Sequence, residues 1–267
     1  MMPSQHRSQH RSQRRGQRRG QRRRVLIALL RGAAGLALAG SLPGMPARAA
    51  AAAALKITVY GGTGRIGSRI VDEALARGHS VTVIAREPSD ATAPRPHLRF
   101  VRGDALDSAG VAAQIAGKDV VISAIGSRGS QGPDFYMRVA QSFVSALRSL
   151  GARAPRLIVV GGAASLEVAP GKLLLDTMPA VDPASDMVTQ KQALDYYRTV
   201  PDVAWSFVSP SLQIEPGTRT GHFRLGGDQL LKDADGRSRI SMEDFAVALI
   251  DEAEHPQHIR SRFTVGY

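Results

Sequence analysis

The apolar and polar positions after residue 54 alternate between short apolar runs and longer amphipathic stretches. The apolar runs span four to six residues and are rich in β-branched side chains, which predicts buried strands. They lie at 55–60, 80–85, 98–101, 119–124, 156–161, 203–208 and 262–265. The stretches between them carry apolar side chains at helical spacing, most clearly over 134–150. Helical crossovers between strands predict an α/β fold with a doubly wound parallel sheet and helices on both faces.

The C-terminal third predicts a small region that covers the substrate. Asp235-Gly236 lies between 228–232 and 238–240 and is a typical β-hairpin turn sequence. Ser241-Met242-Glu243-Asp244 predicts the capped start of a helix that ends at Glu254. Loops follow the fifth and sixth predicted strands, at 163–186 and 209–223, and such loops commonly line ligand sites.

The first strand runs directly into Gly-Gly-Thr-Gly-Arg-Ile-Gly at residues 61–67, and an amphipathic helix follows. Gly61 suits a tight turn after the strand, and Gly67 allows the helix to pack closely on it. Gly64 has no Cβ, so a pyrophosphate can lie against the backbone N–H groups at the positive end of the helix dipole. A strand, this turn, a helix and a second strand together predict dinucleotide binding.

This segment resembles the atypical branch of the short-chain dehydrogenase/reductase superfamily, in particular its NAD(P)H-binding, NmrA-like and biliverdin reductase B/flavin reductase-like members. The resemblance extends over about residues 55–267 and implies a Rossmann-type domain. It implies that Asp104 bonds the adenine amino group and that the segment around Ala124–Gly126 passes the nicotinamide ribose. The implied cofactor residues are Gly61, Thr63, Gly64, Arg65, Ile66, Gly67, Arg86, Asp104, Ala105, Ala124, Ile125 and Gly126. For Asp104, helix capping by Asp104 or Asp107 is the structural alternative.

The end of the second strand favours NADP(H) over NAD(H). Enzymes that use NAD carry an acidic residue about 20 residues after the glycines, where it bonds the ribose hydroxyls. Arg86 stands 19 residues after Gly67 in this chain, and a cation there can pair with a 2′-phosphate. Arg65 could assist. Glu87 is the next residue, so a shift of one position would favour NAD instead.

The catalytic residues are predicted less sharply than the cofactor residues. Ser165 follows the fifth strand, where the resembled superfamily places its active-site serine, and Lys191 is a candidate electrophile. The alternatives are a serine that bonds within its own loop and a solvated helix lysine. The superfamily's Tyr-x-x-x-Lys motif is missing, because Val200 and Pro201 stand four residues after the two tyrosines.

The sequence also bears on an anion-binding site and on a metal site. Arg219 and His222 are candidates to meet an anionic substrate, with a solvated surface position as the alternative. The seven histidines show no metal-ligand spacing, so we expect no metal site.

Members of the biliverdin reductase B/flavin reductase-like group also lack the Tyr-x-x-x-Lys motif. The resemblance therefore implies an NADPH-dependent oxidoreductase that transfers hydride to a flavin, a biliverdin-like tetrapyrrole or a quinone. Such conjugated acceptors need little help beyond correct juxtaposition with the nicotinamide. The alternatives are a non-catalytic NADP(H)-binding sensor of the NmrA-like type and an epimerase or lyase that uses the same fold.

The first 49 residues differ in composition from the rest of the chain. They contain eleven arginines and no acidic residue, whereas the remainder is close to charge balance, so the net charge of +12 belongs to this segment. Basic residues gathered outside the predicted domain argue against a nucleic-acid partner. We expect a monomer or weak homodimer that acts on a small molecule. The chain has no cysteine, which excludes disulfides and thiolate chemistry.

The same segment predicts export. Arg22-Arg23-Arg24 precede a short apolar run over 25–42, and Ala47-Arg48-Ala49 suits signal peptidase. The paired arginines resemble a twin-arginine signal, which implies a periplasmic protein, with residues 50–54 as a linker to the domain at 55–267. Arg31 and the shortness of the run argue against a stable membrane span. The alternatives are a retained anchor and a cytoplasmic protein whose translation starts at Met45.

Overall fold

The computed structural model describes residues 53–87, 95–127 and 132–267, which belong to a unit spanning Ala50–Tyr267. The predicted export signal and most of the linker lie outside the described residues. Within the described residues, no helix has the length and apolarity that crossing a bilayer requires.

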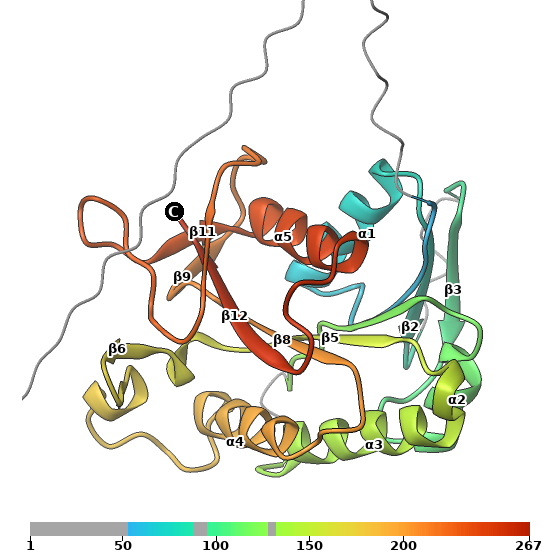
Figure 1. The fold of residues 1–267 in the computed structure, drawn as a ribbon, viewed down its shortest axis with the longest axis horizontal. Coiled ribbons are helices and arrows are strands. Elements are labelled where there is room, and N and C mark those ends of the chain that lie inside the picture. Colours follow the sequence, from blue (N-terminus) through green and yellow to red (C-terminus); the bar gives the residue numbers. More distant parts are fainter. Residues whose placement is uncertain (1–52, 88–94, 128–131) are drawn as a thin grey trace, which may run out of the picture. The chain divides into compact units, whose positions relative to one another are not determined.

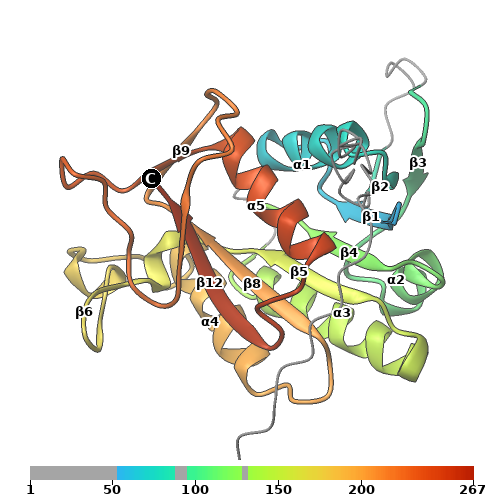
Figure 2. The ribbon, with the colours of Figure 1, turned by 45° about the horizontal axis from the view of Figure 1, so that its top comes forward.

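An eight-stranded sheet forms the centre of the domain, in the order β10-β12-β8-β5-β4-β1-β2-β3 (Figures 1 and 2). Neighbouring strands are parallel except at one edge, where β10 runs antiparallel to β12. The strands are β1 Lys56–Tyr60, β2 Ser80–Ala85, β3 Leu98–Arg102, β4 Val120–Ser123, β5 Arg156–Val160, β8 Trp205–Pro210, β10 Arg224–Gly226 and β12 Ser261–Gly266. All seven predicted strands are therefore confirmed, together with the α/β doubly wound arrangement.

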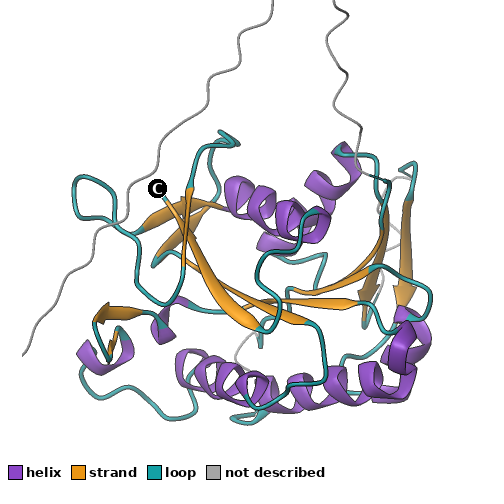
Figure 3. Cartoon of the chain, viewed as in Figure 1, coloured by secondary structure: helices purple, strands orange, loops and turns teal. Residues whose placement is uncertain are grey.

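Helices cover both faces of this sheet, as Figures 1 and 3 show. α1 and α5 pack on one face, and α2, α3 and α4 pack on the other. Their bounds are α1 Arg65–Ala76, α2 Ser108–Ile115, α3 Phe135–Leu150, α4 Asp186–Arg198 and α5 Met242–Glu254. Each face has its own apolar core, because the central strands are buried on both sides.

Two small two-stranded sheets accompany the central sheet. β6 and β7 form a small antiparallel pair, and β9 and β11 form a parallel pair. Their bounds, with the 3-10 helices, are β6 Glu167–Ala169, β7 Lys172–Leu173, β9 Gln213–Glu215, β11 Arg239–Ser241, η1 Gly151–Arg153, η2 Ala163–Ser165 and η3 Leu175–Thr177.

The prediction of a hairpin around Asp235-Gly236 is wrong, although the turn itself forms. Gly236 has a φ of 79°, and its N–H donates to the Asp233 carbonyl over 3.0 Å. The flanking residues pair elsewhere, because Leu230 N–H bonds the Glu167 carbonyl and β11 pairs with β9. A turn sequence fixes a local reversal of the chain, whereas the partner of each flanking strand depends on distant residues.

The predicted start of the last helix is confirmed, with one difference in its capping. Ser241 Oγ accepts the Asp244 N–H over 3.0 Å, as a capping residue should. The Asp244 carboxylate does not accept the Ser241 N–H, which bonds the Tyr267 hydroxyl instead. It accepts N–H groups from Thr220 and Gly221, each over 2.8 Å, and so holds the loop before β10 on α5.

Candidate functional site

The strand order reverses between β1 and β4, and this reversal locates the candidate site. From β1 the chain builds outward through β2 and β3, and from β4 it builds the other way through β5 and β8. The last residues of the two central strands, Tyr60 and Ser123, are paired in register. Ligands of doubly wound sheets bind beyond the carboxyl ends of strands at such a reversal. The segments after β1 and β4 meet there.

Two glycines of the first turn are required by close packing. Gly61 has a φ of 76°, and a Cβ on it would stand 2.4 Å from the Ala124 carbonyl oxygen of the neighbouring segment. A Cβ on Gly67 would stand 2.1 Å from the Gly61 carbonyl oxygen. The turn closes through a 2.9 Å bond from Gly64 N–H to that same oxygen. These contacts agree with the roles inferred from the sequence for Gly61 and Gly67.

The helix behind this turn begins with backbone donors aimed outward. α1 starts at Arg65, and Gly64 precedes it in an extended conformation with no side-chain cap. Uncapped N–H groups at a helix start, with the positive end of the dipole behind them, suit a phosphate group. Thr63 and Arg65 are exposed beside the turn and Ile66 is half-buried. The residues present therefore fit the pyrophosphate of a dinucleotide.

The basic residue predicted to select the cofactor lies at the expected place. Arg86 directly follows β2 and is exposed, and Glu87 beside it is exposed as well. Exposure is therefore the same at the two positions, and it does not choose between Arg86 and Glu87.

The acidic residues after β3 divide into one that caps a helix and one that does not. Asp107 caps α2 by accepting the Gly110 N–H over 3.1 Å. Asp104 is exposed, and within the described part of the chain its carboxylate accepts one hydrogen bond, from the Leu106 N–H over 3.0 Å, while Ala105 next to it is buried. Gln114 bonds the Tyr60 hydroxyl rather than either aspartate. The capping alternative thus applies to Asp107, and Asp104 stays the predicted adenine contact.

A triangle of hydrogen bonds fixes the segment after β4, and sequence reasoning missed it. Tyr136 at the start of α3 accepts the Ser127 N–H over 3.1 Å and donates to Asp186 Oδ2 over 3.0 Å. Ser127 Oγ donates to Asp186 Oδ1 over 2.6 Å. Ala124, Ile125 and Gly126 lie between β4 and this triangle, so α3 and α4 both help to position them.

The electrostatic surroundings of Tyr136 oppose its ionisation. Burial raises the pKa of its phenol, and the Asp186 carboxylate beside it adds to the rise. In a Tyr-x-x-x-Lys pair the lysine has the reverse effect on the tyrosine pKa. Asp186 and Gln190 lie four residues apart on α4, which is the spacing of the tyrosine and lysine in Tyr-x-x-x-Lys. This spacing is the signal in the sequence that could have pointed to Asp186 as a residue of the site.

The two predicted catalytic residues lie on different elements and are not brought into contact. Ser165 ends η2 and is 6% exposed, and its carbonyl oxygen accepts a hydrogen bond from Arg262. η2 packs against α4, because a Cβ on Gly162 would stand 2.3 Å from Gln190 Oε1. Lys191 Nζ is 2.6 Å from Asp195 Oδ2, so its charge is offset along the helix. Ser165 and Lys191 remain predictions.

Arg219, a candidate to meet an anionic substrate, is paired with a carboxylate of this chain. Its guanidinium makes two 2.7 Å bonds to Glu73, which is 6% exposed on α1. The hydrogen bonds from Arg219 lower the pKa of the Glu73 carboxyl and outweigh burial, which acts to raise it. His222 is exposed, and its N–H bonds Thr220 Oγ1. This loop packs on α1 and α5, so it does not cover the end of β5.

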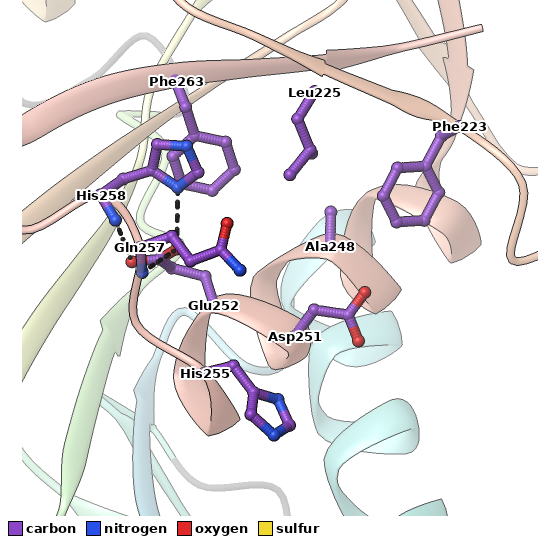
Figure 4. A pocket seen from close by; sticks show the side chains of 9 residues that line it. All are labelled: Phe223, Leu225, Ala248, Asp251, Glu252, His255, Gln257, His258 and Phe263. Atoms are coloured by element: carbon purple, nitrogen blue, oxygen red, sulfur yellow. Dashed lines mark hydrogen bonds and ion pairs between the residues drawn. The ribbon is translucent and has the colours of Figure 1, made fainter. Parts of the chain in front are cut away.

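A hollow of about 240 Å³ lies beside α5, away from the glycine turn (Figure 4). His258 stacks on Phe263 there, with ring centroids 4.1 Å apart, and its Nδ1 lies 2.8 Å from Glu252. Glu252 also accepts the N–H groups of Gln257 and His258 and the Ser206 hydroxyl. Its acceptor positions are therefore used in holding the chain between α5 and β12. Among the described residues no three acidic or histidine side chains form a metal-binding group.

A family model described as NAD(P)H-binding matches residues 61–256, which include the glycine turn, Arg86, Asp104 and the segment after β4. The match ends just beyond α5.

Three solved structures of bacterial proteins resemble the chain over nearly their whole length. A proposed exported protein from Burkholderia pseudomallei is 42% identical, with a TM-score of 0.71, covering 80% of this chain and 100% of its own. A proposed epimerase from Bacteroides thetaiotaomicron is 34% identical, with a TM-score of 0.72 and coverage of 80% and 97%. A proposed NADH-flavin reductase from Streptococcus pneumoniae is 32% identical, with a TM-score of 0.67 and coverage of 79% and 99%.

Proposed function

The chain belongs to the NAD(P)H-binding family, and we propose that it is an NADPH-dependent oxidoreductase that reduces a flavin, a biliverdin-like tetrapyrrole or a quinone. The observation that carries the proposal is the uncapped start of α1 behind a turn in which Gly61 and Gly67 admit no side chain. The similarity to a proposed NADH-flavin reductase supports a conjugated acceptor.

The proposed binding roles follow the order of the strands. The Gly61–Gly67 turn holds the pyrophosphate, and Arg86, assisted by Arg65, pairs with a 2′-phosphate. Asp104 contacts the adenine, and the segment Ala124–Gly126 lies along the nicotinamide ribose. When bound, the dihydronicotinamide supplies the hydride. The triangle at Ser127 keeps that segment in one position, which favours productive juxtaposition.

The absence of an acidic tyrosine favours an acceptor that stabilises its own charge. The phenol of Tyr136 is held protonated, because both its burial and Asp186 raise its pKa. A simple ketone would need a proton donor as negative charge builds on its oxygen. A flavin or quinone delocalises that charge over its rings. Ser165 is the proposed contact to an acceptor oxygen.

Steady-state oxidation of NADPH in the presence of FMN or a soluble quinone tests this function. We expect turnover that saturates with both substrates. If the protein binds NADPH by calorimetry yet transfers no hydride to any of these acceptors, the non-catalytic sensor is the correct function. Exchange at a sugar carbon without net oxidation of the cofactor would instead indicate an epimerase, as proposed for the Bacteroides relative.

The Arg86→Glu variant is expected to lose its preference for NADPH. The change removes a charged hydrogen bond worth about 2 kcal/mol, so NADPH should bind about 30-fold more weakly. NADH binding should change little, because the new carboxylate can bond the ribose hydroxyls. Calorimetric titration of both dinucleotides gives the two Kd values.

Arg99→Glu provides the matched control for charge, because Arg99 is also exposed and lies on the edge strand β3. Arg99→Glu should leave the ratio of the Kd for NADPH to the Kd for NADH unaltered. Equal weakening in both variants would show that general charge, rather than contact with a 2′-phosphate, governs NADPH binding.

We propose further that the protein is exported in folded form through the twin-arginine signal. That route would let the cofactor load before transport. The relative described as a proposed exported protein supports this assignment. Mass spectrometry of the protein from a periplasmic extract should find an N-terminus at Ala50. An intact leader, or a start at Met45 in the cytosolic fraction, would reject it.

A further inference from the structure

A small cavity lies at the carboxyl ends of β4 and β5, on the side covered by α3 and α4. It has a volume of about 20 Å³, and a volume of this size holds about one water molecule. Most of its wall is apolar, including Ile125 and Val160 at the two strand ends. Four side chains with polar atoms interrupt that wall, namely Ser123, Tyr136, Gln190 and Tyr197, and of these, within the described residues, Tyr136 is the one bonded to an exposed carboxylate.

The Ser123 hydroxyl is the first indication of a ligand. Ser123 ends β4, is 4% exposed and lines the cavity. Among the described residues, the fully enclosed side-chain atoms that lack a partner belong to Thr58 and Ser142 and not to Ser123, so the Ser123 hydroxyl is open to a water in the cavity. Gln190 contributes a second polar group, because its Oε1 is close to Gly162 and its amide also acts on the Tyr136 phenol.

A continuous line of groups connects this cavity to solvent. Tyr136 borders the cavity and is 8% exposed, and its hydroxyl bonds Asp186 over 3.0 Å. Asp186 is exposed on the first turn of α4. An exposed carboxyl, a buried phenol and a polar cavity therefore follow one another from the surface to the strand ends. Ile125, which lines the cavity, also belongs to the predicted cofactor segment.

We propose that Asp186, Tyr136 and a water molecule held by Ser123 and Gln190 form a path for proton uptake. The path supplies the proton that accompanies hydride transfer, and it rests on the proposed function. The reduced acceptor takes a proton from the water, and the water takes one from Tyr136. Tyr136 takes a proton from Asp186, which is recharged from solvent. Per turnover, one hydride and one solvent proton reach the acceptor, and every group of the path returns to its starting state.

This path does not require Tyr136 to ionise. Its O–H donates to Asp186 while the carboxylate is charged, and it can turn inward once Asp186 carries a proton. Burial raises the pKa of the Tyr136 phenol and so disfavours its anion. Tyr136 therefore passes one proton to the water at the same time as it accepts another from Asp186. Asp186, Tyr136, Ser123 and Gln190 are thus positioning and relay residues.

Tyr136→Phe and Asp186→Asn test the path with a quinone as acceptor. We expect each variant to lower kcat by about 100-fold and to enlarge the solvent deuterium isotope effect on kcat, which a displaced cofactor segment alone would not do. A small buffer acid should partly rescue Asp186→Asn, because Asp186 is exposed. Tyr196→Phe, which removes a phenol on α4 that does not line the cavity, should behave as wild type.

Ser123→Ala is the second test, and Ser142→Ala is its matched control. Both serines are buried, but Ser142 lies within α3 and does not line the cavity. Ser123→Ala should lower kcat and raise the solvent isotope effect, and Ser142→Ala should do neither. Unchanged kcat in Tyr136→Phe, or a lowered kcat with an unchanged isotope effect, overturns the path. Wild-type protein that binds NADPH but reduces no acceptor instead overturns the proposed function.

Discussion

Gly67→Ala is expected to destabilise the domain by about 3 kcal/mol and to abolish dinucleotide binding. A Cβ at this position would stand 2.1 Å from the Gly61 carbonyl oxygen and 2.9 Å from the Gly62 Cα. Both are backbone atoms, so no side chain can rotate to make room. The helix would have to move away from β1, and the N–H groups at its start would move with it. Denaturant unfolding and calorimetry with NADPH measure the two effects.

Gly64→Ala separates the packing role of these glycines from the binding role. A Cβ on Gly64 meets only the Gly61 carbonyl oxygen, at 3.1 Å, and its backbone is extended. The free energy of unfolding should therefore change by less than about 1 kcal/mol. The added methyl group would nevertheless stand where a pyrophosphate approaches, so NADPH should bind at least about tenfold more weakly. Full binding by Gly64→Ala would mean that the phosphates lie elsewhere.

The sequence predicts the strands and the first turn well because their signals are local. A run such as 119–124 contains its own evidence for burial, and the glycines at 61–67 lie beside the strand and helix that they join. Order along the chain then limits the sheet to few topologies, since crossover connections are right-handed. The glycine turn follows from these local signals, and the resemblance to a known superfamily adds Asp104 and the segment Ala124–Gly126 as candidate cofactor residues.

The side-chain network around the site could not be predicted in the same way. Tyr136 and Asp186 are 50 residues apart, and Arg219 and Glu73 are 146 apart. Nothing near either residue specifies its partner, because the contact exists only after α3 meets α4 or the last loop meets α1. Arg219 was consequently a candidate for an anionic substrate, and no pattern in the sequence singled out Tyr136.

Asp244 is the second residue whose replacement should have a large effect. It is 0% exposed, and its carboxylate accepts four hydrogen bonds, from the Thr220 N–H, the Gly221 N–H, the Thr220 hydroxyl and the Tyr267 hydroxyl. Asp244→Ala would remove the acceptor of all four bonds and release the loop at Thr220 and Gly221 from α5, which should lower the free energy of unfolding by about 3 kcal/mol. Asp235→Ala is the control, because Asp235 is 67% exposed and should change stability by less than about 0.5 kcal/mol.

The pH dependence of stability gives an independent test of the same carboxylate. Burial acts to raise the pKa of Asp244, but the hydrogen bonds outweigh burial and hold it below the ordinary value of 3.8. A carboxyl whose pKa is lower in the folded state stabilises the fold fully above its unfolded pKa, and this contribution is lost as pH falls through the folded pKa. The difference in stability between wild type and Asp244→Asn should therefore be constant near neutral pH and shrink below about pH 4. A difference that stays constant into the acid range would show that the loop is held on α5 by packing and not by the charge of Asp244.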